Sequence, residues 1–130
     1  MPAERAMPLR SVSVKFDVLK QEMQLWRERI VRLIRERATA SEREIAWALV
    51  EEISATRAGL LKKIFIEQNG KNGRLSIQTD PILYRDTQAL SEQALRFSSL
   101  APNMIVKIPA TTAGIAAFEE VTYRGVSVRA

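Results

Sequence analysis

The chain has 130 residues, of which 46% are hydrophobic and 27% are charged, and its formal net charge is +5. This composition is typical of one ordinary soluble globular domain and excludes a disordered chain. No apolar run approaches the length of about 18 residues that a membrane span requires. The sequence contains no cysteine and no histidine, which excludes disulfides, thiolate nucleophiles and imidazole ligands. An enzyme of this composition must work with lysine, carboxylate, amide and hydroxyl groups.

Much of the positive charge is local. Five arginines lie close together, at Arg27, Arg29, Arg32, Arg35 and Arg37. Such a cluster is compatible with binding to nucleic-acid phosphates. Glutamates are interleaved with the arginines, however, and no recognition motif accompanies them, so we favour a solvated helix face. We therefore expect no nucleic-acid partner and no membrane partner.

The first residues carry little pattern. Residues 1–10 include two prolines and lack the apolar segment of a secretory signal, so we expect a cytoplasmic protein. The stretch Ser11–Phe16 alternates polar and apolar residues like a short strand, but it runs directly into a helical pattern. We assign residues 1–16 to a divergent tail and residues 17–130 to a single domain.

Two long helical patterns follow. Apolar residues spaced by three and four predict a helix over residues 17–37, with Asp17 as its N-cap and Trp26 in the core. Ser41-x-x-Glu44 fits a capping box and opens a second helical stretch. That stretch weakens near Gly59 and ends at Asn69-Gly70, where glycine favours a helix C-terminus.

Strands then alternate with helices. Strand patterns over residues 74–80, 103–109 and 125–129 are separated by helical patterns over residues 86–98 and 112–123. This order predicts βαβ crossovers and a parallel sheet. No glycine-rich nucleotide loop follows any strand. The fold class we predict is therefore α/β, as a partial (β/α)8 TIM barrel with about three βα units and long N-terminal helices.

Lys107 stands out because it lies in an otherwise apolar strand. Either the strand is an edge and the lysine is solvated, or the lysine points into a polar site where loss of water favours its neutral, nucleophilic form. Side chains alternate faces along a strand. If the apolar set packs under helices, the residues left to face the barrel interior are Ser76, Gln78, Asp80, Ile105, Lys107, Ser127 and Arg129. This convergence at the carboxyl ends of the strands favours the second reading.

The predicted chemistry is that of a Schiff base. The amine of Lys107 would attack a carbonyl, and the iminium would then act as an electron sink. Gln78 could position a water or a substrate hydroxyl, although an amide does not transfer protons at neutral pH. For Asp80 we favour a helix cap over a pair with Lys107. Arg129 would either act on the lysine electrostatically or belong to a frayed terminus.

The same stretches resemble transaldolase of the actinobacterial type. The resemblance rests on Gly73–Pro81, Asp86-Thr87, Asn103–Thr111 and Gly125–Val128, and it extends to Glu22–Arg27 and Ser98–Asn103. It implies a (β/α)8 barrel that transfers a dihydroxyacetone unit between sugar phosphates in the pentose phosphate pathway, with no cofactor. It also implies that Lys107 is the Schiff-base lysine, on the fourth strand. Many members carry glutamate where this chain has Gln78.

The sequence departs from the family at both ends. Residues 1–16 do not match the first strands of the barrel, and Arg129-Ala130 stands where the fifth strand continues into Asn-x-Thr. A partial barrel has two open sheet edges, which favour self-association. We therefore expect weak or absent activity for these residues alone. The alternative is a non-catalytic fragment that oligomerises or binds a partner through those edges.

Overall fold

The computed structural model describes the backbone of residues 9–130 and the side chains from residue 21 onward. The chain divides into two compact units, one ending at Leu49 and the other comprising Val50–Ala130. The first eight residues of the expected tail lie outside the described part of the chain. The assignment of residues 17–130 to one domain stays a prediction. Among the helices that the structure describes, none is both long and apolar enough to cross a membrane.

The first unit contains helix α1 (Leu9–Glu36) and the beginning of helix α2 (Glu42–Glu67). The helix α1 begins earlier than the sequence pattern predicts, and it includes the strand-like stretch at residues 11–16. A helix satisfies its own backbone hydrogen bonds, whereas a strand needs a neighbouring strand. Residues 11–16 therefore continue the helix, although polar and apolar residues alternate there.

A capping box begins helix α2, as predicted. The Ser41 amide donates to the Glu44 carboxylate at 2.6 Å, and the Glu44 amide donates to Ser41 Oγ at 3.2 Å. Hydrogen bonding from Ser41 to the carboxylate, first from its backbone amide and then from its side chain, holds the pKa of Glu44 below its ordinary value. Free N–H groups at the start of α2 thereby find partners.

The apolar residues of the first unit are only partly covered. Leu33, Ile45, Ala48 and Leu49 are buried. Trp26, which we expected in the core, is only half-buried, so that prediction is wrong. A two-helix unit has too few elements to cover both sides of α1, and the periodicity of one helix does not reveal how many neighbours it has.

The second unit contains a three-stranded parallel sheet in the order β1-β2-β3. Strands β1 (Leu75–Gln78), β2 (Met104–Lys107) and β3 (Val128–Arg129) alternate with helices α3 (Thr87–Ser98) and α4 (Thr112–Tyr123). A short 3-10 helix, η1 (Pro81–Leu83), follows β1 and was not predicted. Helix α2 runs through Gly59 without interruption, and Asn69 and Gly70 take positive φ angles just beyond its end. The predicted element order is otherwise confirmed.

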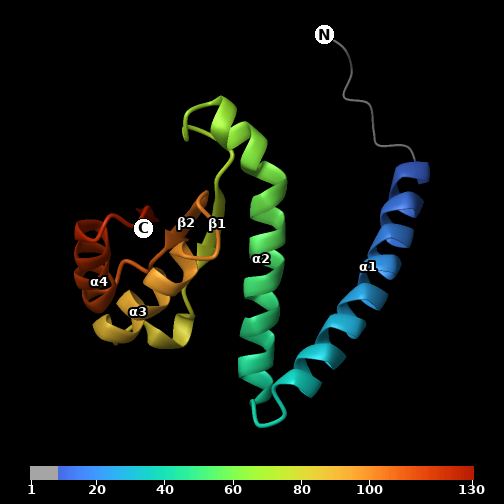
Figure 1. Cartoon of the computed structure of the whole chain (residues 1–130), viewed down its shortest axis with the longest axis horizontal. Helices are drawn as coiled ribbons and strands as arrows, with labels where there is room; N and C mark the ends of the chain where they lie inside the picture. The colour runs from blue at the N-terminus through green and yellow to red at the C-terminus, as the bar shows by residue number, and fades with distance from the viewer. Residues whose placement is uncertain (1–8) are drawn as a thin grey trace. The chain divides into compact units, whose positions relative to one another are not determined.

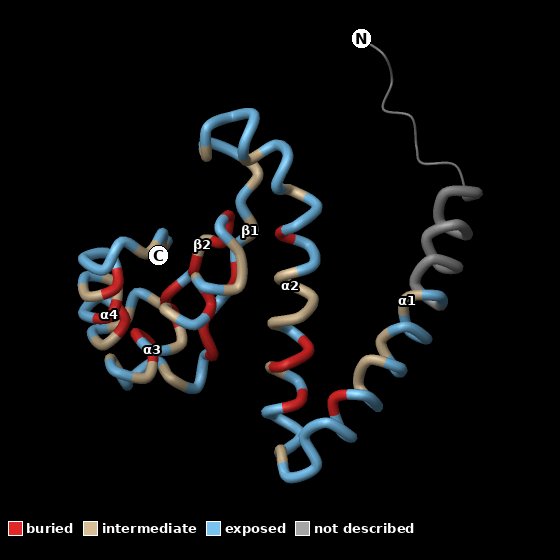
Figure 2. The backbone as a smooth tube through the Cα atoms, viewed as in Figure 1, coloured by how far each residue is buried: buried red, intermediate tan, exposed pale blue. Residues whose placement is uncertain are grey.

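The core of this unit lies between the sheet and helices α3 and α4. The two helices pack against each other, and α3 also packs against β2 (Figure 1). Figure 2 shows buried stretches on β2, α3 and α4. Among the buried residues, Val106, Ile108, Leu90, Phe97 and Val121 are completely or almost completely buried. Full burial of side chains of this size stabilises a fold by about 1.5–3 kcal/mol each.

Both helices that follow strands begin at the residues the sequence indicates. Asp86 caps α3 by accepting from the Ala89 amide at 2.9 Å. Thr111 caps α4 by accepting from the Gly114 amide at 3.0 Å, and its hydroxyl donates to the Tyr84 carbonyl at 2.7 Å. The second bond ties the end of β2 to the loop after β1.

Gly114 is buried where α4 starts against the end of β2. A Cβ at this position would lie 1.8 Å from the Pro109 carbonyl oxygen, far inside van der Waals contact. The glycine is therefore required by the close approach of two backbone segments. Gly59, in the middle of α2, has open space around the same position.

We predict opposite effects for alanine at these two glycines. Gly114→Ala forces the β2–α4 connection apart and lowers the free energy of unfolding by about 2 kcal/mol or more. Gly59→Ala raises it by about 0.5–1 kcal/mol, because alanine favours a helix interior. Urea unfolding followed by circular dichroism measures both. Equal stability of the two variants would show that the Pro109–Gly114 contact is not tight.

Candidate functional site

The sheet register places three polar side chains in one row. Gln78 of β1 is the direct partner of Lys107 in β2, and Lys107 is the direct partner of Arg129 in β3. Neighbouring strands lie about 4.8 Å apart, so three adjacent side chains on one face are within reach of a common small molecule. All three are exposed, on the face opposite the buried Val106 and Ile108. The predicted convergence of Gln78 and Lys107 on one face is confirmed.

Backbone hydrogen bonds hold the lysine in place from both sides. The Lys107 carbonyl accepts from the Thr79 amide at 3.0 Å and from Thr79 Oγ1 at 3.3 Å. On the other side, the Ile108 amide donates to the Arg129 carbonyl at 2.9 Å. The backbone of β2 is therefore hydrogen-bonded to both neighbouring strands at Lys107 and Ile108. The Cα of Lys107 is positioned by a rigid strand rather than by a loop.

Asp80 takes the role that we favoured for it. It is 6% exposed, and its Oδ1 accepts from the Ile82 amide at 3.1 Å as the cap of η1. Its own amide donates to Gln93 Oε1 at 2.6 Å. The second residue after β1 thus supports the loop at the carboxyl end of the sheet, beside the row that contains Gln78.

Asn103 anchors the start of the lysine strand. This buried side chain donates through Nδ2 to the Ala58 carbonyl at 2.7 Å and to the Gly73 carbonyl at 2.9 Å. It joins α2, the approach to β1 and the approach to β2. In the sequence, Asn103 stands out only as part of the Asn103–Thr111 motif. A polar residue directly before a buried strand was the available signal for this structural role.

Arg74 was also missed. It lies one step before β1, and it continues the alternation of Ser76 and Gln78. Its guanidinium donates to Ser127 Oγ at 2.9 Å, so it links β1 and β3 at the amino-terminal end of the open face. It also lies over the Phe65 ring, with 5.3 Å from Cζ to the ring centroid. At its amino-terminal end the open face is therefore tied together by Arg74. At its carboxyl end it carries the row of Gln78, Lys107 and Arg129.

A small apolar cavity of about 180 Å³ lies next to the end of β2. Its lining comes from the β2–α4 connection, from α4 and from the last residue of the sequence: Ile108, Pro109, Ala110, Gly114, Ile115, Phe118 and Ala130. None of these lining residues has a polar side chain, so the only polar groups in the lining are backbone groups. We regard it as a packing hollow beside the row rather than as the reaction site.

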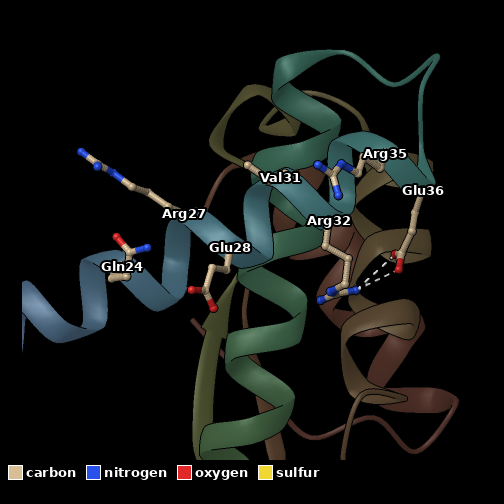
Figure 3. Close-up of a pocket in the computed structure, with 7 residues that line it drawn as sticks. All are labelled: Gln24, Arg27, Glu28, Val31, Arg32, Arg35 and Glu36. Atoms are coloured by element: carbon tan, nitrogen blue, oxygen red, sulfur yellow. Dashed lines mark hydrogen bonds and ion pairs between the residues drawn. The ribbon is translucent and has the colours of Figure 1, made fainter.

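The arginine-rich segment of α1 forms a different kind of surface. A shallow hollow of about 610 Å³ lies along one side of this helix, and Figure 3 shows its seven lining side chains. Arg32 forms an ion pair with Glu36 at 3.2 Å, and both side chains are about half exposed. Acidic side chains are interleaved with the arginines, as expected for a solvated helix face. The charges do not converge on one point, so we do not place the site here.

Among residues whose side chains are described, no group of three acidic side chains is arranged to hold a metal ion. The chemistry of the row itself also differs from that of a metal site, because it offers one amide, one ammonium and one guanidinium. These groups suit a carbonyl or an anion rather than a cation.

Comparison with known proteins identifies the family. The model of the transaldolase/fructose-6-phosphate aldolase family matches residues 18–130, which is most of the chain and all three strands. The chain belongs to this family. The transaldolase/fructose-6-phosphate aldolase assignment confirms the resemblance, and it makes the three parallel strands and the helices between them a portion of the family's (β/α)8 barrel.

Individual relatives agree with this assignment. Transaldolase 1 of Streptomyces avermitilis is 41% identical over 73 residues, which cover 55% of this chain and 19% of that protein. The transaldolase of Thiobacillus denitrificans is 35% identical over 101 residues, covering 76% of this chain and 28% of that protein. The chain thus spans less than a third of the length of the curated relatives it matches.

Proposed function

We propose that Lys107 is the Schiff-base nucleophile of a transaldolase-type reaction on sugar phosphates. The observation that carries this proposal is the register of the sheet. It aligns Lys107 with Gln78 at the carboxyl ends of parallel strands, which is where sites of this barrel fold lie. Membership of the transaldolase/fructose-6-phosphate aldolase family supports the same chemistry.

The reaction would begin when the neutral amine attacks the ketone carbon of a ketose phosphate. Loss of water gives an iminium, which accepts the electron pair of the carbon–carbon bond as the aldehyde portion leaves. The dihydroxyacetone unit that remains on Lys107 would then attack a second aldehyde, and hydrolysis would free the lysine. No cofactor is required, because the iminium itself is the electron sink. A cytoplasmic role in carbohydrate metabolism fits these substrates.

Turnover by these residues alone should be weak or absent. Lys107 and Gln78 are both exposed in the described structure. A Schiff-base lysine is activated by removal of water or by a neighbouring cation, and electrostatic stabilisation of the reaction is strongest in a site that excludes water. We therefore separate formation of the adduct at Lys107, which needs only a nucleophile and a carbonyl, from the complete transfer reaction.

Borohydride trapping tests the role of Lys107. Reduction in the presence of a ketose phosphate should leave a stable adduct, and mass spectrometry of peptides should locate it on Lys107. Lys107→Met should abolish this adduct, whereas Lys62→Met, a matched change at an exposed position of α2, should leave it unchanged. Absence of the adduct, under conditions that label a longer member of the family, would overturn the proposal.

Gln78 is proposed to position the water that leaves and re-enters the Schiff base. An amide orients a water but supplies no proton, whereas a carboxylic acid does both. Gln78→Glu should therefore raise the rate of adduct formation at Lys107 by about tenfold or more, and Gln78→Ala should lower it. Gln24→Glu on α1 controls for the added charge. Equal trapping rates in all four proteins would remove Gln78 from the mechanism.

A second candidate function is self-association through the sheet edges. In the described residues β1 and β3 each pair on one side only. Alternate amides of β1 donate to β2, since Leu75 N bonds Asn103 O and Thr79 N bonds Lys107 O, so the Ser76 amide points away from β2. Such an edge is a template for a further strand.

Sedimentation velocity measures this second function. The unmodified chain should form concentration-dependent oligomers, and Ser76→Pro should reduce them by removing an edge donor while keeping both internal bonds. Circular dichroism checks that the variant keeps its helices. A monomer at all concentrations would exclude the interaction role.

A further inference from the structure

The three strands contain two charged side chains, and both are cationic. Lys107 ends β2 and Arg129 ends β3. The two residues are direct register partners, both are exposed, and both belong to the open face. The row therefore presents an amine and a guanidinium from neighbouring strands at one level of the sheet.

The position of Arg129 is fixed by its backbone, independently of its side chain. Its carbonyl accepts from the Ile108 amide at 2.9 Å, and the preceding turn brings the Ser127 carbonyl to the Val106 amide at 3.0 Å. The Cα of Arg129 is thus held in a paired strand, and the base of its side chain lies beside that of Lys107 on the same face of the sheet. Substitution of the side chain leaves both ladder bonds in place.

A guanidinium beside a Schiff-base amine selects for a particular kind of carbonyl compound. The planar fork of arginine matches the two oxygens of a carboxylate. In a 2-oxo acid, the carboxylate is bonded directly to the carbon that the amine attacks. In a ketose phosphate, the phosphate lies at the far end of the molecule and the neighbouring group is a neutral hydroxymethyl. Arg129, the neighbour of Lys107, therefore suits a 2-oxo acid better than a ketose phosphate.

We propose that Arg129 is a substrate-binding residue that gives this site affinity for 2-oxo acids, through a two-point contact with the carboxylate. This inference rests on the proposed role of Lys107, and it extends that role to a second substrate class. Gln78, on the opposite side of the lysine, remains available to the carbonyl oxygen or to water.

The covalent step conserves atoms and electrons. The nitrogen lone pair of Lys107 forms a bond to the ketone carbon, and the carbonyl electron pair moves to oxygen, which takes up the proton released by nitrogen. Protonation of the resulting hydroxyl by solvent allows water to leave, and the iminium remains. The carboxylate is unchanged and stays against the guanidinium. Added borohydride then supplies the hydride that reduces the iminium to a stable secondary amine.

Competitive trapping tests the inference. The chain is reduced with borohydride in an equimolar mixture of pyruvate and dihydroxyacetone, and the two Lys107 adducts, which differ in mass, are quantified on the same peptide. Arg129→Gln should lower the ratio of pyruvate adduct to dihydroxyacetone adduct by roughly tenfold, as expected for loss of a charge-assisted contact. Arg129→Lys, which keeps the charge but loses the fork, should give an intermediate ratio.

The controls distinguish the proposed role of Arg129 from the proposed Schiff-base role of Lys107. Arg57→Gln removes an exposed arginine of α2 and should leave the ratio unchanged. The dihydroxyacetone adduct reports in every variant that the site is intact. If dihydroxyacetone labels Lys107 but the ratio is the same with and without Arg129, the 2-oxo acid inference is overturned and the Schiff-base role stands. If neither compound labels Lys107, both are overturned.

Discussion

The alternation of side chains along β2 is the constraint on which the rest of the second unit depends. Met104, Val106 and Ile108 are buried beneath the helices, so the residue between the last two must face the other way. That residue is Lys107. The same packing that stabilises the strand therefore brings the one lysine of the sheet to the open face, and a shift of register by one residue would exchange a buried valine for a charged ammonium.

Parallel pairing then determines what the lysine meets. The register aligns residues that are far apart in the chain, Gln78 before Lys107 and Arg129 after it, without any turn connecting them directly. The supports are equally distant in sequence, as in the contact of Asn103 with Ala58 on α2. A row of this kind is rigid in its backbone and adaptable in its side chains, which suits a group that must change from amine to iminium during a reaction.

The first unit has a different physical character. Its capping box fixes where α2 begins, and the lowered pKa of Glu44 reflects the hydrogen bonding of its carboxylate to Ser41 rather than a site. The arginines of α1 are interleaved with glutamates along an exposed helix, and Arg32 forms an ion pair with Glu36 one turn further along the helix. The candidate site residues therefore lie on the sheet and not on α1. The family match covers both the sheet and most of the helices.

The sequence by itself determined the kinds of element and the face on which the polar residues lie. Helix periodicity, the Ser41-x-x-Glu44 box and strand alternation are local properties, and each acts within a few residues. For that reason Lys107 and Gln78 could be assigned to one face before the sheet was seen. Asp80 could likewise be assigned to a cap.

Only the tertiary structure decided which residues from distant segments lie next to one another. The half-burial of Trp26, the helical start of α1 and the roles of Asn103 and Arg74 depend on which elements lie beside them. The pairing of Lys107 with Arg129 depends on the register of strands separated by a whole helix. Burial and register are relations between distant segments, and a pattern within one segment carries no information about them.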